Sequence, residues 1–372
     1  ALYDSHISAG AKMVDFHGFE LPIWYSSIQE EHLQTRSTSG IFDVSHMGFF
    51  HFQGEGVRSW LSTLSTQDYM KFRPGTCGYA HFLDPNGHII DDMIFAVQSE
   101  NEVLGVPNST MVGIMLEWLE KNLPDDGSIS IEDKSEQTSI IALQGPSSRS
   151  IISQVLGSAN SVNRFRCQEI MENESGIKGW IQGTGYTGED GFEIFVSNHD
   201  APILWEALLS RESPSPVPVG LGARDTLRME KGYLLSGQDF LWPRIDDSSS
   251  TLPRGFLSRN TAETAVPFGL DMNHDFIGKE AILQDPNPSE IWQGLTCLER
   301  GPSPRTGHPV LDCDDEESRI IGYVTSGGPS PSMGMSGIAL AYMERRSLGD
   351  QVWIQSSSRR RVRAEVTGTP FV

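Results

Sequence analysis

Long apolar runs are absent from this sequence, and cysteine is scarce. No stretch approaches the ~20 apolar residues that a membrane-spanning helix needs, and the first residues, ALYDSHISAG, lack the layout of a secretory signal. The cysteines lie far apart and form no C-x-x-C pair, which argues against a zinc site or a disulfide scaffold; they are Cys77, Cys167, Cys297 and Cys313. We therefore expect no membrane association and a reducing, intracellular setting.

Positive charge is also in short supply. The 28 basic residues are outnumbered by 49 acidic ones, and the net charge of −21 opposes general binding to nucleic acid or to an anionic membrane. One local excess of arginine near the C-terminus is typical of a solvated hairpin face, although it would also suit an acidic partner. It comprises Arg345, Arg346, Arg359, Arg360, Arg361 and Arg363.

Familiar catalytic signatures are missing as well. The sequence contains no G-x-S-x-G elbow, no H-E-x-x-H pair and no G-x-x-x-x-G-K-[ST] loop. Mechanisms that depend on a nucleophilic serine or cysteine, or on a metal, are therefore disfavoured.

What is present indicates a mixed α+β protein. A chain of 372 residues exceeds one ordinary core, so two or three domains are expected. Short strands and helices are mixed without the regular rhythm of a doubly wound sheet, which favours α+β. Past Ile282, short β-prone runs separated by Gly, Pro and Ser predict a small β-barrel or sandwich. Residues 246–264 predict a long loop or insertion.

The most informative stretch is 183–193, which reads GTGYTGEDGFE. Its first six residues match G-x-G-x-x-G, but a dinucleotide fingerprint must open a helix, whereas here a turn and a β-prone run follow. We therefore predict a glycine-rich hairpin whose backbone closely approaches another group. Alternation in its second strand leaves Glu193 on the face opposite to Phe192 and Ile194. Glu193 is then either solvated on a half-exposed sheet or presented to a ligand with two adjacent N–H donors.

Two further positions are candidates for chemistry. Asp91 and Asp92 are adjacent on a predicted strand, so they point to opposite faces and at most one belongs to a site; an acid facing water at a strand edge explains either equally well. Arg224 lies in the first turn of a predicted helix, where the positive end of the helix dipole disfavours a cation. A carboxylate from elsewhere in the protein or from a ligand would compensate it, unless Arg224 is an ordinary surface residue.

Seven motifs occur in one order along the chain: KMVDFHGFELP (12–22), GIFDVSHM (40–47), the strand with Asp91 and Asp92, ALQGP (142–146), GYTGEDGFE (185–193), GARDTLR (222–228) and GYVTSGGPSPS (322–332). Together they resemble the T-protein of the glycine cleavage system, a folate-binding aminomethyltransferase family. The likeness runs almost from end to end, and GYTGEDG separates this branch from more distant folate-binding relatives.

The resemblance implies an α+β fold with three domains in a cloverleaf around a tetrahydrofolate pocket. Residues 1–50 with 135–270 would form the first α+β folate-binding domain, residues 51–134 the second, and residues 285–372 a C-terminal β-barrel. It also implies an enzyme that transfers the methylene of an aminomethyl-dihydrolipoyl H-protein to tetrahydrofolate and releases ammonia, without a metal. Such an enzyme would work in the cytoplasm, or in the mitochondrial matrix of a eukaryote.

Site residues follow from the resemblance by their place in the motifs. Asp92 corresponds to the essential acid, Glu193 to the carboxylate that binds the pterin, and Arg224 to the arginine of the folate site. Tyr186 and Asn108 match positions that line or support the pocket.

The chain departs from the family pattern in two places. The segment 241–264 is longer than usual, and residues 291–293, Ile-Trp-Gln, stand where basic residues are common. H-protein docking is therefore less firmly implied than folate binding. Two other functions suit the same scaffold: a folate-dependent demethylase of a small methylated sulfonium or amine, and a non-catalytic folate-binding module.

Overall fold

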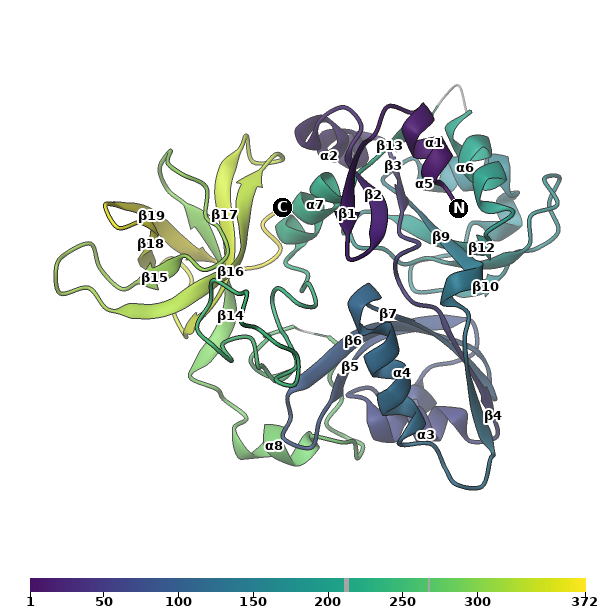
Figure 1. The fold of residues 1–372 in the computed structure, drawn as a ribbon, viewed down its shortest axis with the longest axis horizontal. Coiled ribbons are helices and arrows are strands. Elements are labelled where there is room, and N and C mark those ends of the chain that lie inside the picture. Colours follow the sequence, from purple (N-terminus) through teal and green to yellow (C-terminus); the bar gives the residue numbers. More distant parts are fainter. Residues whose placement is uncertain (211–213, 267) are drawn as a thin grey trace. The chain divides into compact units, whose positions relative to one another are not determined.

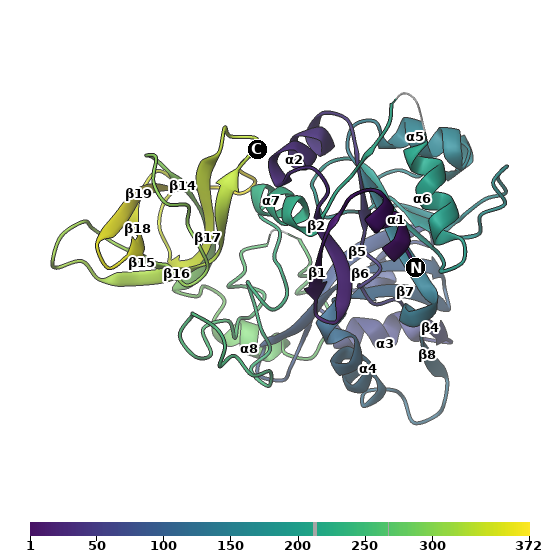
Figure 2. The ribbon, with the colours of Figure 1, turned by 45° about the horizontal axis from the view of Figure 1, so that its top comes forward.

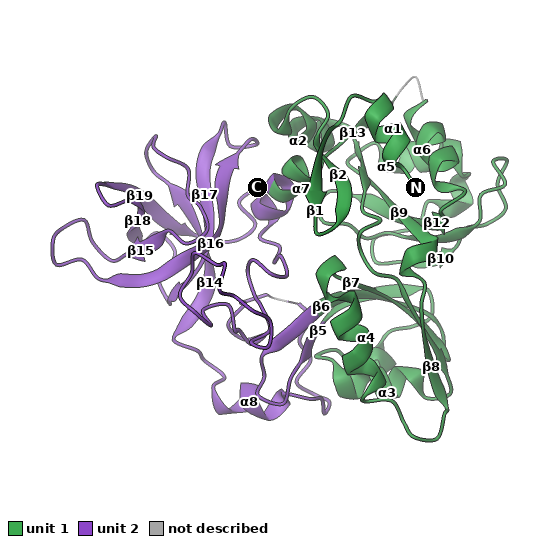
Figure 3. Ribbon diagram, in the orientation of Figure 1, with its two compact units in different colours: residues 1–80, 92–225 green, residues 81–91, 226–372 purple. Residues whose placement is uncertain are grey.

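The computed structural model describes residues 1–210, 214–266 and 268–372. The chain forms two compact units, residues 1–80 with 92–225 (unit 1) and residues 81–91 with 226–372 (unit 2), which Figure 3 colours separately. The boundary between them crosses three elements, β5 (Thr76–Leu83), β6 (Ile89–Ser99) and α7 (Leu221–Lys231). All the residues predicted to form the site belong to unit 1, namely Asp92, Asn108, Tyr186, Glu193 and Arg224.

Unit 1 contains a six-stranded sheet in the order β10-β11-β12-β9-β3-β13. Its pairs are antiparallel, except that β13 runs parallel to β3. The strands are β10 (Cys167–Glu169), β11 (Gly179–Gln182), β12 (Gly191–Ser197), β9 (Thr138–Gln144), β3 (Gly40–Asp43) and β13 (Val217–Pro218). The β11–β12 pair confirms the predicted glycine-rich hairpin.

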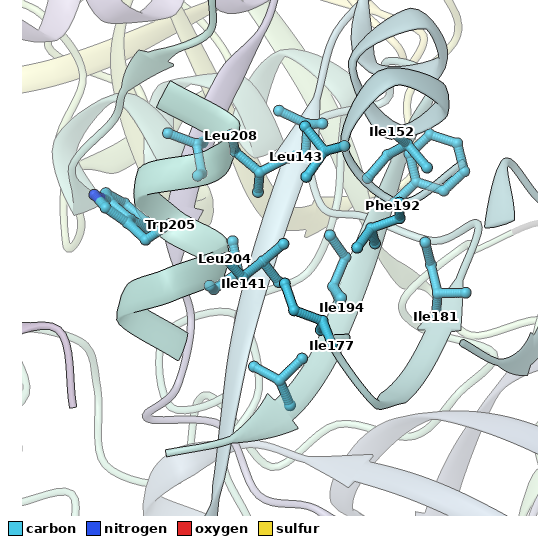
Figure 4. Close-up of a cluster of buried hydrophobic side chains, with 14 of the residues drawn as sticks. Ile141, Leu143, Ile152, Ile177, Ile181, Phe192, Ile194, Leu204, Trp205 and Leu208 are labelled. Carbon is cyan, nitrogen blue, oxygen red and sulfur yellow. The ribbon is translucent and has the colours of Figure 1, made fainter. Parts of the chain in front are cut away.

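The core of this sheet lies on the face covered by helices α5 (Ser148–Val155) and α6 (Ala201–Leu209) (Figure 1). Alternation turns Ile141 of β9 and Phe192 and Ile194 of β12 toward these helices, and α6 turns Leu204 and Leu208 toward the strands (Figure 4). Each such buried side chain contributes about 1.5–3 kcal/mol of hydrophobic free energy. The face opposite to this core is therefore the one on which Glu193 stands.

Three smaller elements complete this part of unit 1. They are α1 (Tyr3–Ser8), the hairpin of β1 (Lys12–Phe16) and β2 (Phe19–Trp24), and α2 (Ile28–Ser37). Helix α2 begins where the Ser27 hydroxyl accepts the backbone N–H of Glu30, so a side chain satisfies one of the unpaired amides of the first turn.

A five-stranded sheet has the order β5-β6-β7-β4-β8. Its other strands are β7 (Glu102–Pro107), β4 (Phe50–Gly54) and β8 (Ile129–Asp133), with helices α3 (Val57–Leu64) and α4 (Val112–Glu120). Helix α3 buries the apolar stripe expected from its spacing, Val57, Trp60, Leu61 and Leu64. Met93 of β6 pairs with Pro107 of β7, which brings Asp92 close to Asn108, the residue that follows β7.

Unit 2 contains a closed barrel in the order β14-β17-β16-β15-β18-β19 (Figure 2). Its strands are β14 (Glu290–Cys297), β15 (Pro309–Leu311), β16 (Ile320–Ser330), β17 (Ser336–Glu344), β18 (Gln351–Ser357) and β19 (Arg360–Thr367), preceded by α8 (Lys279–Gln284). Closure through the β14–β19 pair leaves no open sheet edge. The predicted α+β class with a C-terminal barrel is confirmed, whereas the division into three domains stays a prediction.

The predicted insertion is an ordered part of unit 2. Residues 241–264 contain no helix or strand, yet the Arg259 guanidinium lies over the rings of Phe256 and Tyr342, at 4.4 and 4.3 Å from their centroids. The same guanidinium pairs with Glu263 at 2.9 Å and Glu290 at 3.0 Å. The loop is therefore held by cation–π contacts and ion pairs together. Across the described ranges, no helix is both long and apolar enough to cross a bilayer.

Candidate functional site

Asp92 lies half-buried on β6 and has a donor at each carboxylate oxygen. The Tyr79 hydroxyl donates to Oδ2 at 2.6 Å, and the Asn108 side-chain amide donates to Oδ1 at 2.5 Å. Asn108 also donates to the Asp92 backbone carbonyl at 3.3 Å. Because both donors are neutral, they fix the carboxylate without cancelling its charge.

Asp91 occupies the other face of the strand, as the alternation predicts. Its side chain is fully buried, and its Oδ1 accepts the Ser236 hydroxyl at 2.8 Å. The alternative that this acid faces water is therefore wrong, and Asp91 is placed to support packing within unit 2.

Glu193 lies opposite Gln182 across the β11–β12 pair. Its Oε2 accepts the hydroxyl of Thr184 and, at 3.2 Å, the amide N–H of Gln182. Gln182 is itself oriented by Trp180, whose indole N–H donates to the Gln182 amide oxygen at 3.3 Å. Glu193 itself is only half-buried, although Gln182 and Thr184 are buried, so the choice between a solvated carboxylate and one presented to a ligand stays open.

Arg224 stacks on Tyr186, with its guanidinium carbon 4.7 Å from the ring centroid. Burial lowers the pKa of Arg224, while Tyr186 and Glu193 act to raise it. Glu193 is therefore near enough to Arg224 to favour its charge, while a compensating carboxylate for this cation in the first turn of α7 stays a prediction.

The glycines of the hairpin permit close approach, but to the protein itself. A Cβ on Gly185 would lie 1.9 Å from the Gln144 amide oxygen, and one on Gly191 would lie 2.5 Å from its amide nitrogen. Gln144 accepts the Thr187 hydroxyl at 3.0 Å and donates to the Thr184 carbonyl at 3.1 Å. Gln144 thus braces the loop that carries Thr184 and Tyr186.

The two carboxylates in the turn of this hairpin serve as anchors. Arg36 donates to Glu189 at 2.8 Å, and Arg149 donates twice to Asp190, at 2.6 and 3.2 Å. Such two-point contacts fix geometry as well as charge. The acidic pair therefore holds the loop in place and leaves Glu193 as its candidate ligand group.

Strand β5 connects the Asp92 group with the Glu193 group. Cys77 lies near enough to Glu193 for that carboxylate to help raise the pKa of its thiol, after burial and Cys167. Tyr79, two residues further along the same strand, shares the face of Cys77 and donates to Asp92. All these residues belong to unit 1.

His46 lies close to Arg224 in the same unit and is 6% exposed. Burial first, and then the charge of Arg224, lower the pKa of His46 to about 3. The imidazole is therefore neutral at physiological pH, so it adds no second cation beside Arg224.

Comparison with known proteins decides the family. The model described as "GCVT N-terminal domain" matches residues 2–243, and the one described as "Glycine cleavage T-protein C-terminal barrel domain" matches residues 293–372. The chain belongs to the glycine cleavage T-protein family. The family and fold class predicted from the motifs are thereby confirmed.

Individual relatives match from end to end. The aminomethyltransferase of Thermotoga petrophila is 34% identical over 375 residues, covering 100% of this chain and 96% of that protein. That of Geobacillus kaustophilus is 33% identical over 375 residues and covers 100% and 97%. The crystal structure of glycine cleavage system aminomethyltransferase T from Bartonella henselae has a TM-score of 0.86 at 28% identity, and covers 100% of this chain and 97% of that one.

The sequence of this T-protein family member does not predict several residues that contact the candidate site residues. Tyr79, Gln144, Gln182 and Thr184 each contact a predicted site residue or its loop. Gln182 and Thr184 lie just before the predicted hairpin turn, so the register of the two strands would have pointed to Gln182. Within the described residues, no group of three or more His, Cys, Asp or Glu side chains is arranged to hold a metal.

Proposed function

We propose that this chain transfers the methylene carbon of an aminomethyl group, carried on the dihydrolipoyl arm of H-protein, to tetrahydrofolate and releases ammonia. Aminomethyl transfer in glycine cleavage is its activity, because aminomethyltransferases match it along its whole length. One observation best supports the detailed reaction: Tyr79 and Asn108 hold both oxygens of the Asp92 carboxyl group.

Glu193, Arg224 and Tyr186 suit the recognition of a reduced pterin. A pterin presents a ring N–H beside an amino group, and these are donors that a carboxylate such as Glu193 accepts. Arg224 stacked on Tyr186 adds a planar, cationic surface beside that carboxylate. We assign Glu193 to the pterin, with Arg224 and Tyr186 at the same folate site.

Asp92 suits the chemical step. Transfer of an aminomethyl group builds positive, iminium-like charge while a folate nitrogen attacks, and a fixed carboxylate stabilises that charge or helps to remove a proton. Because Tyr79 and Asn108 already hold both oxygens, the carboxylate needs little reorientation during the reaction. We assign Asn108 to this supporting role beside Asp92.

Residues 291–293, which replace the basic residues common in the family, are engaged within unit 2. Ile291 and Trp292 are buried, and the Trp292 indole N–H donates to Thr325 at 3.2 Å. Trp292 packs in the cluster that contains Phe240 and Tyr342. Gln293 donates to the Arg346 carbonyl at 2.9 Å. The proposal of H-protein as partner is supported by the aminomethyltransferase relatives and not by these residues.

The other two functions are not favoured. Neither a demethylase nor a non-catalytic folate-binding module is among the relatives described above, which are aminomethyltransferases matched over at least 96% of their own length.

Replacing Glu193 with alanine is expected to weaken tetrahydrofolate binding about 10- to 100-fold, because hydrogen bonds to a charged group contribute about 1.5–3 kcal/mol. Titration calorimetry with tetrahydrofolate measures this, and Glu206→Ala, on the exposed face of α6, is the matched control. Wild-type affinity in Glu193→Ala would remove the pterin role from this residue.

A further inference from the structure

We propose that Thr184 and Gln182 are positioning residues that hold Oε2 of Glu193, so that the carboxylate presents Oε1 to the pterin. The proposal rests on the proposed function, because it takes Glu193 as the group that binds the ligand. It names the side chains that determine how this group meets its substrate.

The network around Glu193 is buried and directional. Gln182 is 1% exposed, Trp180 5% and Thr184 7%. The Gln182 amide N–H donates to Thr184 Oγ1 at 2.8 Å and to Glu193 Oε2 at 3.2 Å, and the Thr184 hydroxyl donates to the same Oε2. Two donors therefore converge on one oxygen of the carboxylate.

Trp180 determines which way the Gln182 amide points. An indole N–H can only donate, so the group facing it must be the amide oxygen. The NH₂ end of Gln182 then necessarily faces Thr184 and Glu193. The direction of the hydrogen bonds, from Trp180 to Gln182 and from Gln182 to Glu193, is thus fixed by which groups can donate as well as by the strand register.

The consequence concerns the oxygen left for the ligand. A carboxylate oxygen accepts about two hydrogen bonds, and within the described residues Gln182 and Thr184 both donate to Oε2 of Glu193. The N–H donors of a pterin must therefore converge on Oε1.

Loss of a donor frees the carboxylate to rotate. Glu193 would then have to be ordered when the ligand binds, and ordering a flexible side chain lowers affinity. Thr184→Val removes the hydroxyl at nearly constant shape, whereas Thr184→Ser retains it. Thr63→Val, on the exposed face of α3, is the matched control for a threonine-to-valine change.

The test measures tetrahydrofolate affinity by calorimetry, and the KM for tetrahydrofolate and kcat from ammonia release. We expect Thr184→Val to weaken binding about tenfold and to raise KM by a similar factor with little change in kcat. Thr184→Ser and Thr63→Val should stay within about twofold of the wild type. Trp180→Phe, which removes the indole donor together with some buried ring volume, should weaken binding severalfold and serves if Thr184→Val does not fold.

A double-mutant cycle separates positioning from a general structural role. In a Glu193→Ala background the Thr184→Val change should have no further effect on affinity, because no carboxylate remains to be positioned. If Glu193→Ala weakens binding but Thr184→Val and Trp180→Phe do not, the positioning proposal is wrong and the pterin role of Glu193 stands. The positioning proposal is also wrong if Thr184→Val lowers tetrahydrofolate affinity by the same factor in the presence and in the absence of the Glu193 carboxylate. If Glu193→Ala itself binds normally, the pterin assignment fails, and the positioning proposal fails with it.

Discussion

Asp92→Asn is expected to reduce turnover of aminomethylated H-protein by about a hundredfold or more. Losing one preorganised electrostatic group at a reacting centre commonly costs about 3 kcal/mol of barrier. Asparagine keeps the shape of the side chain but carries no charge, and its NH₂ group would face the donor of either Tyr79 or Asn108. The measurement is kcat for ammonia release with lipoylated H-protein and tetrahydrofolate.

The control for this change is Asp125→Asn, which alters an exposed acid elsewhere in unit 1. Thermal unfolding of Asp92→Asn should resemble that of the wild type, since the half-buried side chain keeps its volume. Near-normal turnover in Asp92→Asn would show that Asp92 is not the essential acid.

Arg228→Met is expected to lower the free energy of unfolding by about 3–5 kcal/mol. Arg228 and Asp239 pair at 2.7 Å with both side chains fully buried in unit 2. Arg228 also donates to Ser326 at 2.8 Å, and Asp239 accepts that hydroxyl at 2.7 Å. Removing the arginine leaves a buried aspartate without its cation, and burial of an uncompensated charge is costly.

Chemical denaturation of the single and double variants measures this effect. In Arg228→Met combined with Asp239→Leu the orphaned charge is gone, so part of the lost stability should return. A loss below about 1 kcal/mol in Arg228→Met, as for an exposed pair, would show that this ion pair does not support unit 2.

Several features of the fold and the candidate site can be predicted from residues that are close together in the sequence. Two-residue alternation separates Asp91 from Asp92 and puts Glu193 opposite the apolar face of β12, and both inferences hold in the structure. The β11–β12 hairpin could be predicted because the glycines of residues 183–191 are followed by a β-prone run and not by a helix. These features depend on residues within about ten positions of one another.

The contacts that complete the site depend on pairing between distant segments. Gln144, on β9, meets the hairpin loop only because β9 lies beside β12, and this neighbour explains why Gly185 and Gly191 lack side chains. Tyr79 reaches Asp92 through the neighbouring strand of the same sheet. No local periodicity specifies such partners, so the sequence predicts the carboxylates and, through the family resemblance, Asn108, but not the other donors that hold them.

Aminomethyl transfer to tetrahydrofolate is tested most directly by product analysis after the purified chain is mixed with aminomethylated H-protein, with and without tetrahydrofolate. We expect fast ammonia release that requires tetrahydrofolate, with methylene-tetrahydrofolate formed in equal amount. Formation of methyl-tetrahydrofolate, or folate binding without any transfer, would contradict it.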